Sequence, residues 1–175
     1  MLQLNIPEVE YFDERTNEFI EVKAHTLLLE HSLLSISKWE AKWRKPFLGK
    51  EDKTQEETMD YIRCMTINRD VDPLVYRAIS NEELVRIKEY INAPMTATWF
   101  NDRDKRPPSR KVITSELVYY WMVAQNIPFE CEKWHFNRLM TLIRICGEKN
   151  QPPKKMGKME RKNLMAQRRA ASRKH

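Results

Sequence analysis

Two tryptophans on one side of a short predicted helix constrain this chain more than any other feature. Ile36, Trp39 and Trp43 are spaced by three and four residues, so they share one face of an α-helix. Ser37 and Glu40 have the spacing of a capping box, which predicts that they satisfy free amides of the first helical turn. Because two neighbouring indoles can together bury a few hundred Å², we expect this stripe to form part of the core.

The composition is that of a globular protein. The chain has 175 residues, of which 41% are hydrophobic and 32% charged, and these values exclude wholesale disorder. No apolar run reaches the length needed to span a bilayer. The first residues lack the basic region and apolar core of a signal peptide, so we expect a cytoplasmic protein. Cys64, Cys131 and Cys146 are odd in number and widely spaced, which predicts reduced thiols.

Positive charge is concentrated near the C-terminal end. Residues 151–175 contain nine Lys or Arg and one acid, a net charge of +8. Residues 1–150 contain 22 basic and 24 acidic groups, a net charge of −2. Pro152 and Pro153 stiffen the boundary between these two parts. We therefore predict a globular domain over residues 1–150 and a basic tail, helical or disordered, over residues 151–175.

The front of the chain predicts a β-hairpin. Residues 1–7 are a short extended lead, since Pro7 disfavours helix at the residue before it. Residues 9–24 are rich in Tyr, Phe, Ile and Val around a polar centre at residues 13–17, a pattern typical of two strands joined by a multi-residue loop. Residues 26–29 either prolong the second strand or add a third.

Helix signals recur along the rest of the chain, up to about residue 146. The predicted helix starts after the tryptophan stripe are Thr54 with Glu57, Asp72-Pro73, Ser80 with Glu83, Ser115 and Glu130. The last two helices are expected to end at Asn126 and Cys146, with Gly147 as a C-terminal stop. Residues 101–111 form a charged loop with proline, which Trp99 and Phe100 are expected to anchor.

The fold class predicted from these signals is mainly α, a compact multi-helix domain with an N-terminal β-hairpin and a basic C-terminal tail. Its core is expected to contain apolar and aromatic side chains from the helix stripes. These predicted core residues are Ile36, Trp39, Trp43, Ile62, Trp121, Trp134, Leu139, Leu142 and Ile143.

No pattern of residues predicts catalysis. The histidines have no metal-type partner spacing, the cysteines form no Cys-x-x-Cys, and the three glycines build no phosphate-binding loop. Asp102 and Asp104 lie in a loop rich in Arg and Lys, where solvated charges explain them better than an acid–base pair. We therefore expect no catalytic residue, no cofactor and no metal ion.

The basic tail contains the predicted partner-binding residues. Met159, Leu164 and Met165 form one apolar edge of a tail helix, which favours folding on a protein partner. The positive charge favours salt-dependent binding to nucleic acid, although without an aromatic residue for base stacking such binding would be unspecific. A solvated appendage is the third interpretation. The candidates are Lys154, Lys155, Met156, Met159, Leu164, Met165, Arg168 and Arg169.

Three segments carry a resemblance to a known family. They are SISKWEAKWRKPFL at residues 35–48, KTQEETMDYIRCM at residues 53–65 and NRLMTLIRICGEKNQPPKKM at residues 137–156. These segments resemble tail assembly chaperones of long-tailed bacteriophages, and the similarity spans most of the chain. The resemblance implies a partner, the tape measure protein, whose long hydrophobic helices would aggregate before the tail tube encloses them.

The same resemblance implies a second, longer form of the protein. Such families make it when ribosomes slip back by one nucleotide near the end of the first reading frame. Met156-Gly157-Lys158 is compatible with such a site, because a GGA glycine codon would give G-GGA-AAR, on which both transfer RNAs can re-pair. The expected partners are the tape measure protein, the frameshifted form, the tail tube protein and further copies of the chain, with no membrane.

The mechanism predicted from this resemblance is holding, without catalysis. Nine methionines supply flexible contacts that can re-pack around varied partners. The expected location is the cytoplasm of the infected bacterium, and the mature virion should lack the protein. Two alternatives stay open: a nucleic-acid-binding accessory protein that uses the tail and the loop at residues 101–111, and a small tail or connector protein that remains in the particle.

Overall fold

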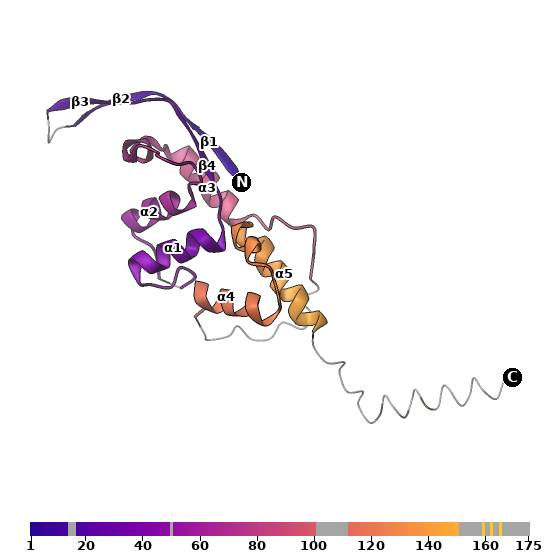
Figure 1. The fold of residues 1–175 in the computed structure, drawn as a ribbon. Coiled ribbons are helices and arrows are strands. Elements are labelled where there is room, and N and C mark those ends of the chain that lie inside the picture. Colours follow the sequence, from indigo (N-terminus) through magenta and orange to yellow (C-terminus); the bar gives the residue numbers. More distant parts are fainter. Residues whose placement is uncertain are drawn as a thin grey trace. The chain divides into compact units, whose positions relative to one another are not determined.

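The computed structural model describes residues 1–13, 17–49, 51–100 and 112–150, together with Met159, Lys162 and Met165. Helices predominate in these residues, and the strands come first in the chain (Figure 1). The strands are β1 (Leu2–Ile6), β2 (Val9–Asp13), β3 (Glu18–Val22) and β4 (His25–Leu29). The helices are α1 (Leu33–Trp43), α2 (Gln55–Met65), η1 (Pro73–Ala78), α3 (Asn81–Asn92), α4 (Ser115–Ala124), η3 (Phe129–Lys133) and α5 (Phe136–Lys149), where η denotes a 3₁₀ helix.

The chain divides into two units, residues 1–144 and residues 145–175. The division falls inside α5. The predicted domain boundary at residue 150 stays a prediction.

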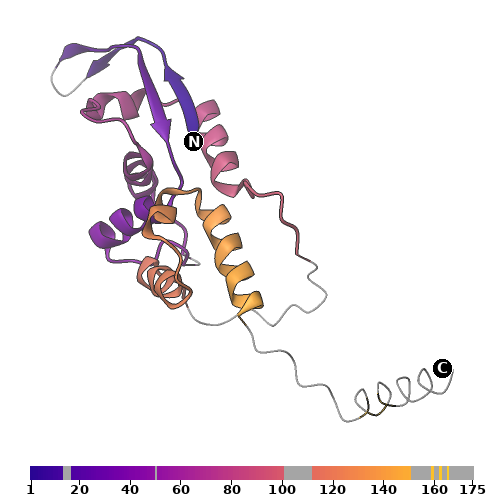
Figure 2. The same cartoon turned by 45° about the vertical axis from the view of Figure 1, so that its right-hand side comes forward.

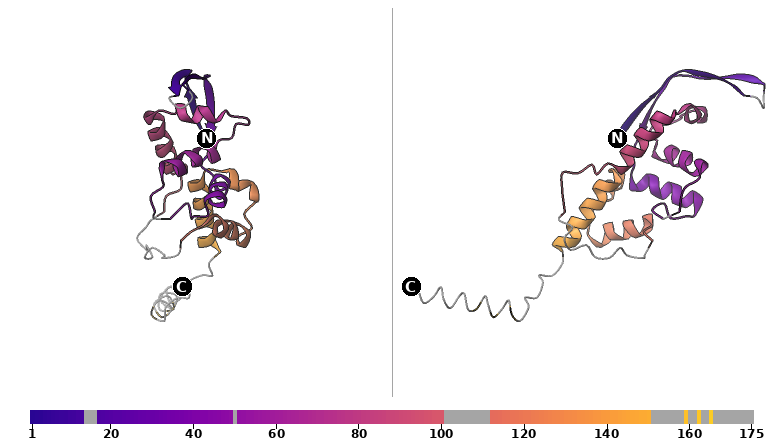
Figure 3. Two further views of the ribbon diagram at one scale, coloured as in Figure 1. Left: turned by 90° about the vertical axis from the view of Figure 1, so that its left-hand side faces the viewer. Right: turned by 180° about the vertical axis from the view of Figure 1, so that it is seen from behind.

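The four strands form an antiparallel ribbon in two parts. β1 pairs with β4 as far as Ile6 opposite His25, and β2 pairs with β3 from Val9 opposite Val22. The register is the same in both parts, with two unpaired residues on each strand between them. Pro7 lies in this gap, and its missing N–H explains why the ladder is interrupted there. In Figures 1 and 3 the β2–β3 hairpin extends beyond α2.

These strands confirm the predicted hairpin within residues 9–24, although the residues at 14–16 lie outside the described part of the chain. Residues 1–7, predicted as a short extended lead, contain a strand, β1. Local sequence does not reveal this strand, because its partner β4 comes from a distant part of the sequence. Residues 26–29 belong to this separate strand β4. The outer edge of β4 is also covered, since Ile67 N donates to Leu28 O at 2.8 Å and Glu30 N donates to Met65 O at 2.9 Å.

α1 and α2 pack side by side around the predicted tryptophan stripe. Ile36 and Trp39 are each 1% exposed. Trp39 Nε1 donates a hydrogen bond to Glu57 O at 2.8 Å, and Trp43 Nε1 donates to Asp60 Oδ2 at 2.9 Å. Both indole N–H groups therefore have acceptors on α2, which buried or half-buried tryptophans require.

α1 begins one turn earlier than the predicted capping box implies. Its N-cap is Ser32, and Ser35 at the N3 position completes a reciprocal pair of hydrogen bonds between the two serines. Ser37 and Glu40 lie inside the helix, so the prediction of a capping box at these residues was wrong. The carboxylate of Glu40 instead accepts hydrogen bonds from the backbone amides of Phe47 and of the distant Ser115.

The other predicted helix starts before residue 115 are confirmed. Thr54 with Glu57 and Ser80 with Glu83 form complete capping boxes at the starts of α2 and α3. The Asp72 side chain accepts from Leu74 N at 2.9 Å at the start of η1. Local side-chain chemistry is sufficient to place these three boundaries.

The predicted helix from Glu130 to Cys146 is interrupted. The chain is extended at Trp134, which separates η3 from α5. Phe136 N donates to His31 O at 2.7 Å, and His135 forms an isolated β-bridge with the residue after His31. Tertiary pairing with the start of α1 therefore interrupts a segment whose local pattern is helical.

Two further findings concern single residue types. Gly147 lies inside α5, which continues to Lys149, so the prediction that Gly147 stops the helix was wrong. All three cysteines are free thiols, as predicted.

Within the described part of the chain, no helix combines the length and apolar character that crossing a membrane would require.

The core is built from side chains of the β1–β4 pair and of α1, α2, α3, α4 and α5. α3 lies beside β1 (Figure 2). The predicted core residues that are buried are Ile36, Trp39, Ile62, Leu139 and Ile143. The other predicted core residues, Trp43, Trp121, Trp134 and Leu142, are half-buried. Large indoles are seldom fully buried, and the ring of Trp134 lies 4.3 Å from the Arg138 guanidinium at the margin of the core.

Candidate partner-binding surface

Helix α4 is apolar around nearly its whole circumference. Among its ten residues, Ser115 and Glu116 alone have side chains that are neither aliphatic nor aromatic. Val118 and Met122 are fully buried on the side that packs against α1. A helix at a protein surface normally has charged or polar residues on its outer face. On α4 that face contains Tyr120 and Val123, which are 64% and 57% exposed.

Three further side chains belong to the same surface. Val123 is 57% exposed and lies one helical turn from both Tyr119 and Tyr120. Phe129 at the start of η3 is 56% exposed, and its ring centroid lies 6.3 Å from that of Tyr119. We call Tyr119, Tyr120, Val123 and Phe129 the α4 patch.

A buried carboxylate fixes the start of α4 against α1. Glu40 Oε1 accepts a hydrogen bond from Phe47 N at 2.7 Å, and Glu40 Oε2 accepts one from Ser115 N at 2.7 Å. The N-cap residue Thr114 makes no side-chain capping bond, so Glu40 supplies an acceptor for the first turn of α4. The negative charge also interacts favourably with the helix macrodipole. The α4 patch is therefore held on a rigid support.

Tyr119 is held at the inner edge of the patch by its hydroxyl group. Tyr119 Oη donates to Glu132 Oε2 at 2.7 Å. Burial and this hydrogen bond both raise the pKa of Tyr119, so its phenol is neutral at physiological pH. The hydrogen bond to Glu132 on η3 thus orients the ring of Tyr119, and the ring of Phe129 lies beside it.

The chemistry of the α4 patch is that of a protein-binding surface. Its four side chains include three aromatic rings and no charged group. Each aromatic side chain can bury on the order of 150–250 Å², so a partner could cover a few hundred Å² here. Contiguous exposed apolar surface of this size marks interaction sites in proteins.

The predicted tail residues are described in part. Met159 and Met165 are helical and exposed, at 73% and 58%, and Lys162 between them is also exposed. The other candidates, Lys154, Lys155, Met156, Leu164, Arg168 and Arg169, lie outside the described residues. Partner binding by the tail stays a prediction.

Sequence reasoning missed the α4 patch. The prediction assigned one residue of this helix, Trp121, to the core and gave no role to Tyr120 or Val123. The signal was present in the sequence, because the run at residues 117–124 offers no charged side chain for a solvent-facing stripe. An apolar helix of this kind needs cover on more than one side.

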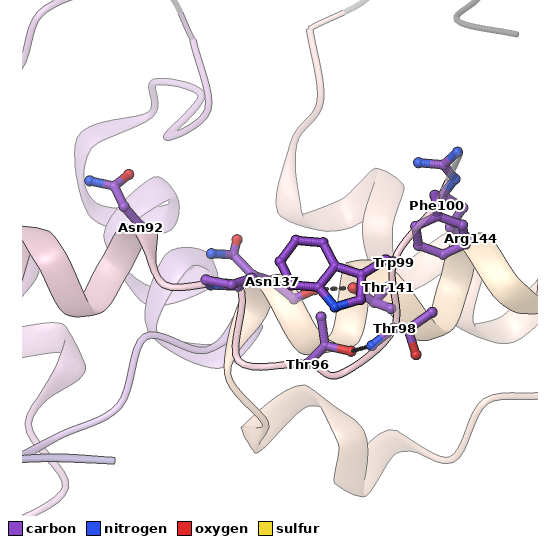
Figure 4. Close-up of a pocket in the computed structure, with 9 residues that line it drawn as sticks. Asn92, Thr96, Thr98, Trp99, Phe100, Asn137, Thr141 and Arg144 are labelled. Carbon is purple, nitrogen blue, oxygen red and sulfur yellow. Dashed lines mark hydrogen bonds between the residues drawn. The ribbon is translucent and has the colours of Figure 1, made fainter. Parts of the chain in front are cut away.

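A groove of about 370 Å³ lies between α5 and the segment that follows α3 (Figure 4). Asn137 Nδ2 holds the end of α3 and the start of that segment by donating to Ile91 O at 3.0 Å and to Ala93 O at 2.8 Å. Phe100 lies 3.8 Å from the Arg144 guanidinium, whereas Trp99 is 85% exposed. The expectation that both aromatics are anchored was therefore wrong for Trp99, and the loop at residues 101–111 lies outside the described residues.

Two buried histidines lie together at the start of α1. The ring centroids of His31 and His135 are 5.2 Å apart. His31 Nδ1 is 2.5 Å from Tyr61 Oη, and His135 Nε2 donates to Tyr90 O at 3.0 Å. Burial and the neighbouring His135 lower the pKa of His31 to about 3, and burial also lowers the pKa of His135. These neutral, enclosed rings support the fold and cannot reach a substrate in solution.

The described residues contain no group of three or more His, Cys, Asp or Glu side chains that could hold a metal ion. Comparisons with protein families, curated proteins and solved structures find no match.

Proposed function

We propose that this chain is a tail assembly chaperone of a long-tailed bacteriophage. It binds apolar helices of the tape measure protein and keeps them soluble until the tail tube encloses them. The observation that carries the proposal is the α4 patch, an exposed apolar surface on a firmly supported helix. The three sequence segments that resemble this chaperone family support the choice of partner.

The spacing of residues in the patch suits a helical partner. Tyr120 and Val123 are three residues apart, so they form part of a ridge that can pack into the groove of a facing helix. Phe129 closes one end of this surface. A partner helix with apolar residues at positions i, i+3, i+4 and i+7 would match it.

The size of the patch suits reversible binding. Covering about 400 Å² of apolar surface at roughly 25 cal/mol/Å² stabilises a complex by on the order of 10 kcal/mol, before the free-energy cost of association is subtracted. Loss of translational and rotational freedom opposes this by about 4–15 kcal/mol. The resulting affinity is modest, so the tape measure protein can be released when the tube assembles around it.

The same proposal includes the other expected partners and the location. A longer frameshifted form shares the α4 patch and can bind the same partner, and the tail tube protein receives the released cargo. Further copies of the chain can cover a long partner side by side. The protein acts in the cytoplasm of the infected bacterium and is absent from the mature virion.

Co-expression with the tape measure protein tests the proposal. The wild-type chain should keep the tape measure protein in the soluble fraction, and Tyr120→Ser/Val123→Ser should lose most of this effect. Val85→Ser is the matched control, because Val85 is an exposed valine on another helix, at 56% against 57% for Val123. Equal solubility with the patch variant and with the control would refute the proposal.

Two further measurements separate the alternative functions. Mass spectrometry of purified particles should detect no stoichiometric amount of this chain, whereas a virion component would be present. DNA binding that is strong at low salt and weakens steeply at moderate salt would favour the accessory protein that binds nucleic acid, whereas failure to bind at both salt concentrations would exclude it.

A further inference from the structure

The β2–β3 hairpin carries a second exposed surface of different chemistry. Phe12 and Phe19 are opposite each other in the register, with ring centroids 5.1 Å apart, and they are 46% and 70% exposed. Glu10 and Glu21, also opposite each other and exposed, are two residues along each strand and so lie on the same face. We call these four residues the hairpin face.

The reverse side of the hairpin packs on the body of the fold. Val22 is 2% exposed, Val9 and Ile20 are half-buried, and β3 contacts η1. The apolar side needed for folding is therefore already used. The hairpin face is the side that folding leaves uncovered.

The hairpin face is unfavourable as a purely solvent-exposed surface. Like charges directly opposite each other destabilise an antiparallel pair, and Glu10 stands opposite Glu21. Exposed Phe12 and Phe19 add apolar surface in water. Local conflicts of this kind are expected at functional sites.

A cationic segment with apolar residues would remove both conflicts. Its Lys and Arg groups would neutralise the opposed carboxylates and lie over the aromatic rings, and its apolar side chains would cover the phenylalanines. Residues 8–23 contain six acids and two basic residues, a net charge of −4, and residues 151–175 have a net charge of +8 with Met and Leu interspersed. The chain itself thus contains a segment of complementary chemistry.

We infer that the hairpin face binds the basic C-terminal segment, residues 151–175, of a second copy of this chain. The contact is intermolecular and links copies through opposite charge and apolar cover. It is independent of the proposed function, because it needs no tape measure protein and does not use the α4 patch.

Fluorescence anisotropy of a labelled synthetic peptide with the sequence of residues 151–175 tests this inference. Titration with the full-length protein at 50 mM salt should give saturable binding that weakens at least tenfold at 500 mM salt. Glu10→Lys/Glu21→Lys should weaken binding at least tenfold, and Phe19→Ser severalfold. The control Glu51→Lys/Glu89→Lys changes the net charge equally at exposed sites elsewhere and should stay within twofold of wild type.

Sedimentation velocity of the full-length protein completes the test. The wild type should associate as its concentration rises, and the free peptide should dissociate the complex. Equal weakening in the hairpin and control charge variants would overturn the inference, because binding would then follow net charge alone. A chain that binds the peptide but stays monomeric at every concentration would overturn it as well. Unchanged thermal melting of each variant shows that the fold is retained.

Discussion

Glu40 shows how one side chain can set the position of an entire helix. Its two carboxylate oxygens accept hydrogen bonds from Phe47 N and Ser115 N, and the latter partner is 75 residues away in the sequence. Both amides are on segments that would otherwise present unsatisfied donors in a buried place. The placement of the α4 patch therefore depends on a residue outside it.

Removing this carboxylate should destabilise the fold. Glu40→Ala leaves two buried amides without their acceptor, at a cost of about 1–3 kcal/mol each, so we expect the free energy of unfolding to fall by about 3 kcal/mol. Urea denaturation measures this change. The control Glu89→Ala, at an exposed position on α3, should stay within about 0.5 kcal/mol of wild type. Similar values for the two variants would contradict the role of Glu40.

His31 gives the folded chain a pH dependence of defined sign. Its pKa is about 3 in the folded chain and about 6.5 when unfolded. Below pH 6.5 the unfolded chain binds a proton that the folded chain does not, so stability present above this pH is lost as pH falls, by about 1.4 kcal/mol per pH unit. His135, whose pKa is also lowered, contributes in the same direction.

Urea denaturation at pH 7 and pH 5 tests this linkage. We expect His31→Gln to lose about 2 kcal/mol less than wild type between the two pH values, because the variant has no imidazole to protonate at this position. The difference between the two pH values isolates the titration from any general destabilisation by the substitution. The same loss in both proteins would show that His31 is not the titrating group.

At the scale of elements, boundaries set by neighbouring residues were predictable. Thr54 with Glu57 and Ser80 with Glu83 place the starts of α2 and α3, because each box is formed by two side chains only three positions apart. The spacing alone is not sufficient, since Ser37 and Glu40 share it and lie inside α1. Local signals failed where a distant segment intervened. Trp134 has a helical neighbourhood, yet pairing of the next residues with the start of α1 holds it extended.

The α4 patch was missed for a related reason. The sequence shows that α4 is apolar on all sides, but it does not show which side faces α1. Tertiary packing makes that choice, through the burial of Val118 and Met122 and the hydrogen bond between Glu40 and Ser115, and no local pattern reveals it. The pairing of β1 with β4 depends equally on a long-range partner.

The start of α1 offers a direct comparison of two serines. Ser32→Ala removes the side-chain acceptor at the N-cap and should lower the free energy of unfolding by about 1 kcal/mol. Ser37→Ala lies inside the helix, where alanine has the higher helix propensity, and should be neutral or slightly stabilising. Thermal denaturation of both variants decides between the two cap positions. A larger loss of stability for Ser37→Ala than for Ser32→Ala would refute Ser32 as the N-cap.

At the scale of the whole molecule, the buried hydrophobic side chains of the described residues belong to the unit at residues 1–144. Every residue of the α4 patch and of the hairpin face lies in residues 1–144. Both surfaces therefore lie in the same compact unit.

Deleting residues 151–175 should leave a folded protein. We expect the truncated chain to melt in a single cooperative transition within a few degrees of the full-length protein, since the buried core residues lie before the deletion. Differential scanning calorimetry measures this transition. A broad, non-cooperative melt would show that the predicted boundary at residue 150 is misplaced.

Hydroxyl-radical footprinting of the chain with and without the tape measure protein tests the central claim most directly. We predict that oxidation of Tyr120 and Phe129 slows severalfold in the complex, because the partner helix covers these rings, while the exposed Trp99 keeps its rate as an internal reference. Unchanged oxidation of Tyr120 and Phe129 in a complex that has formed would contradict the account.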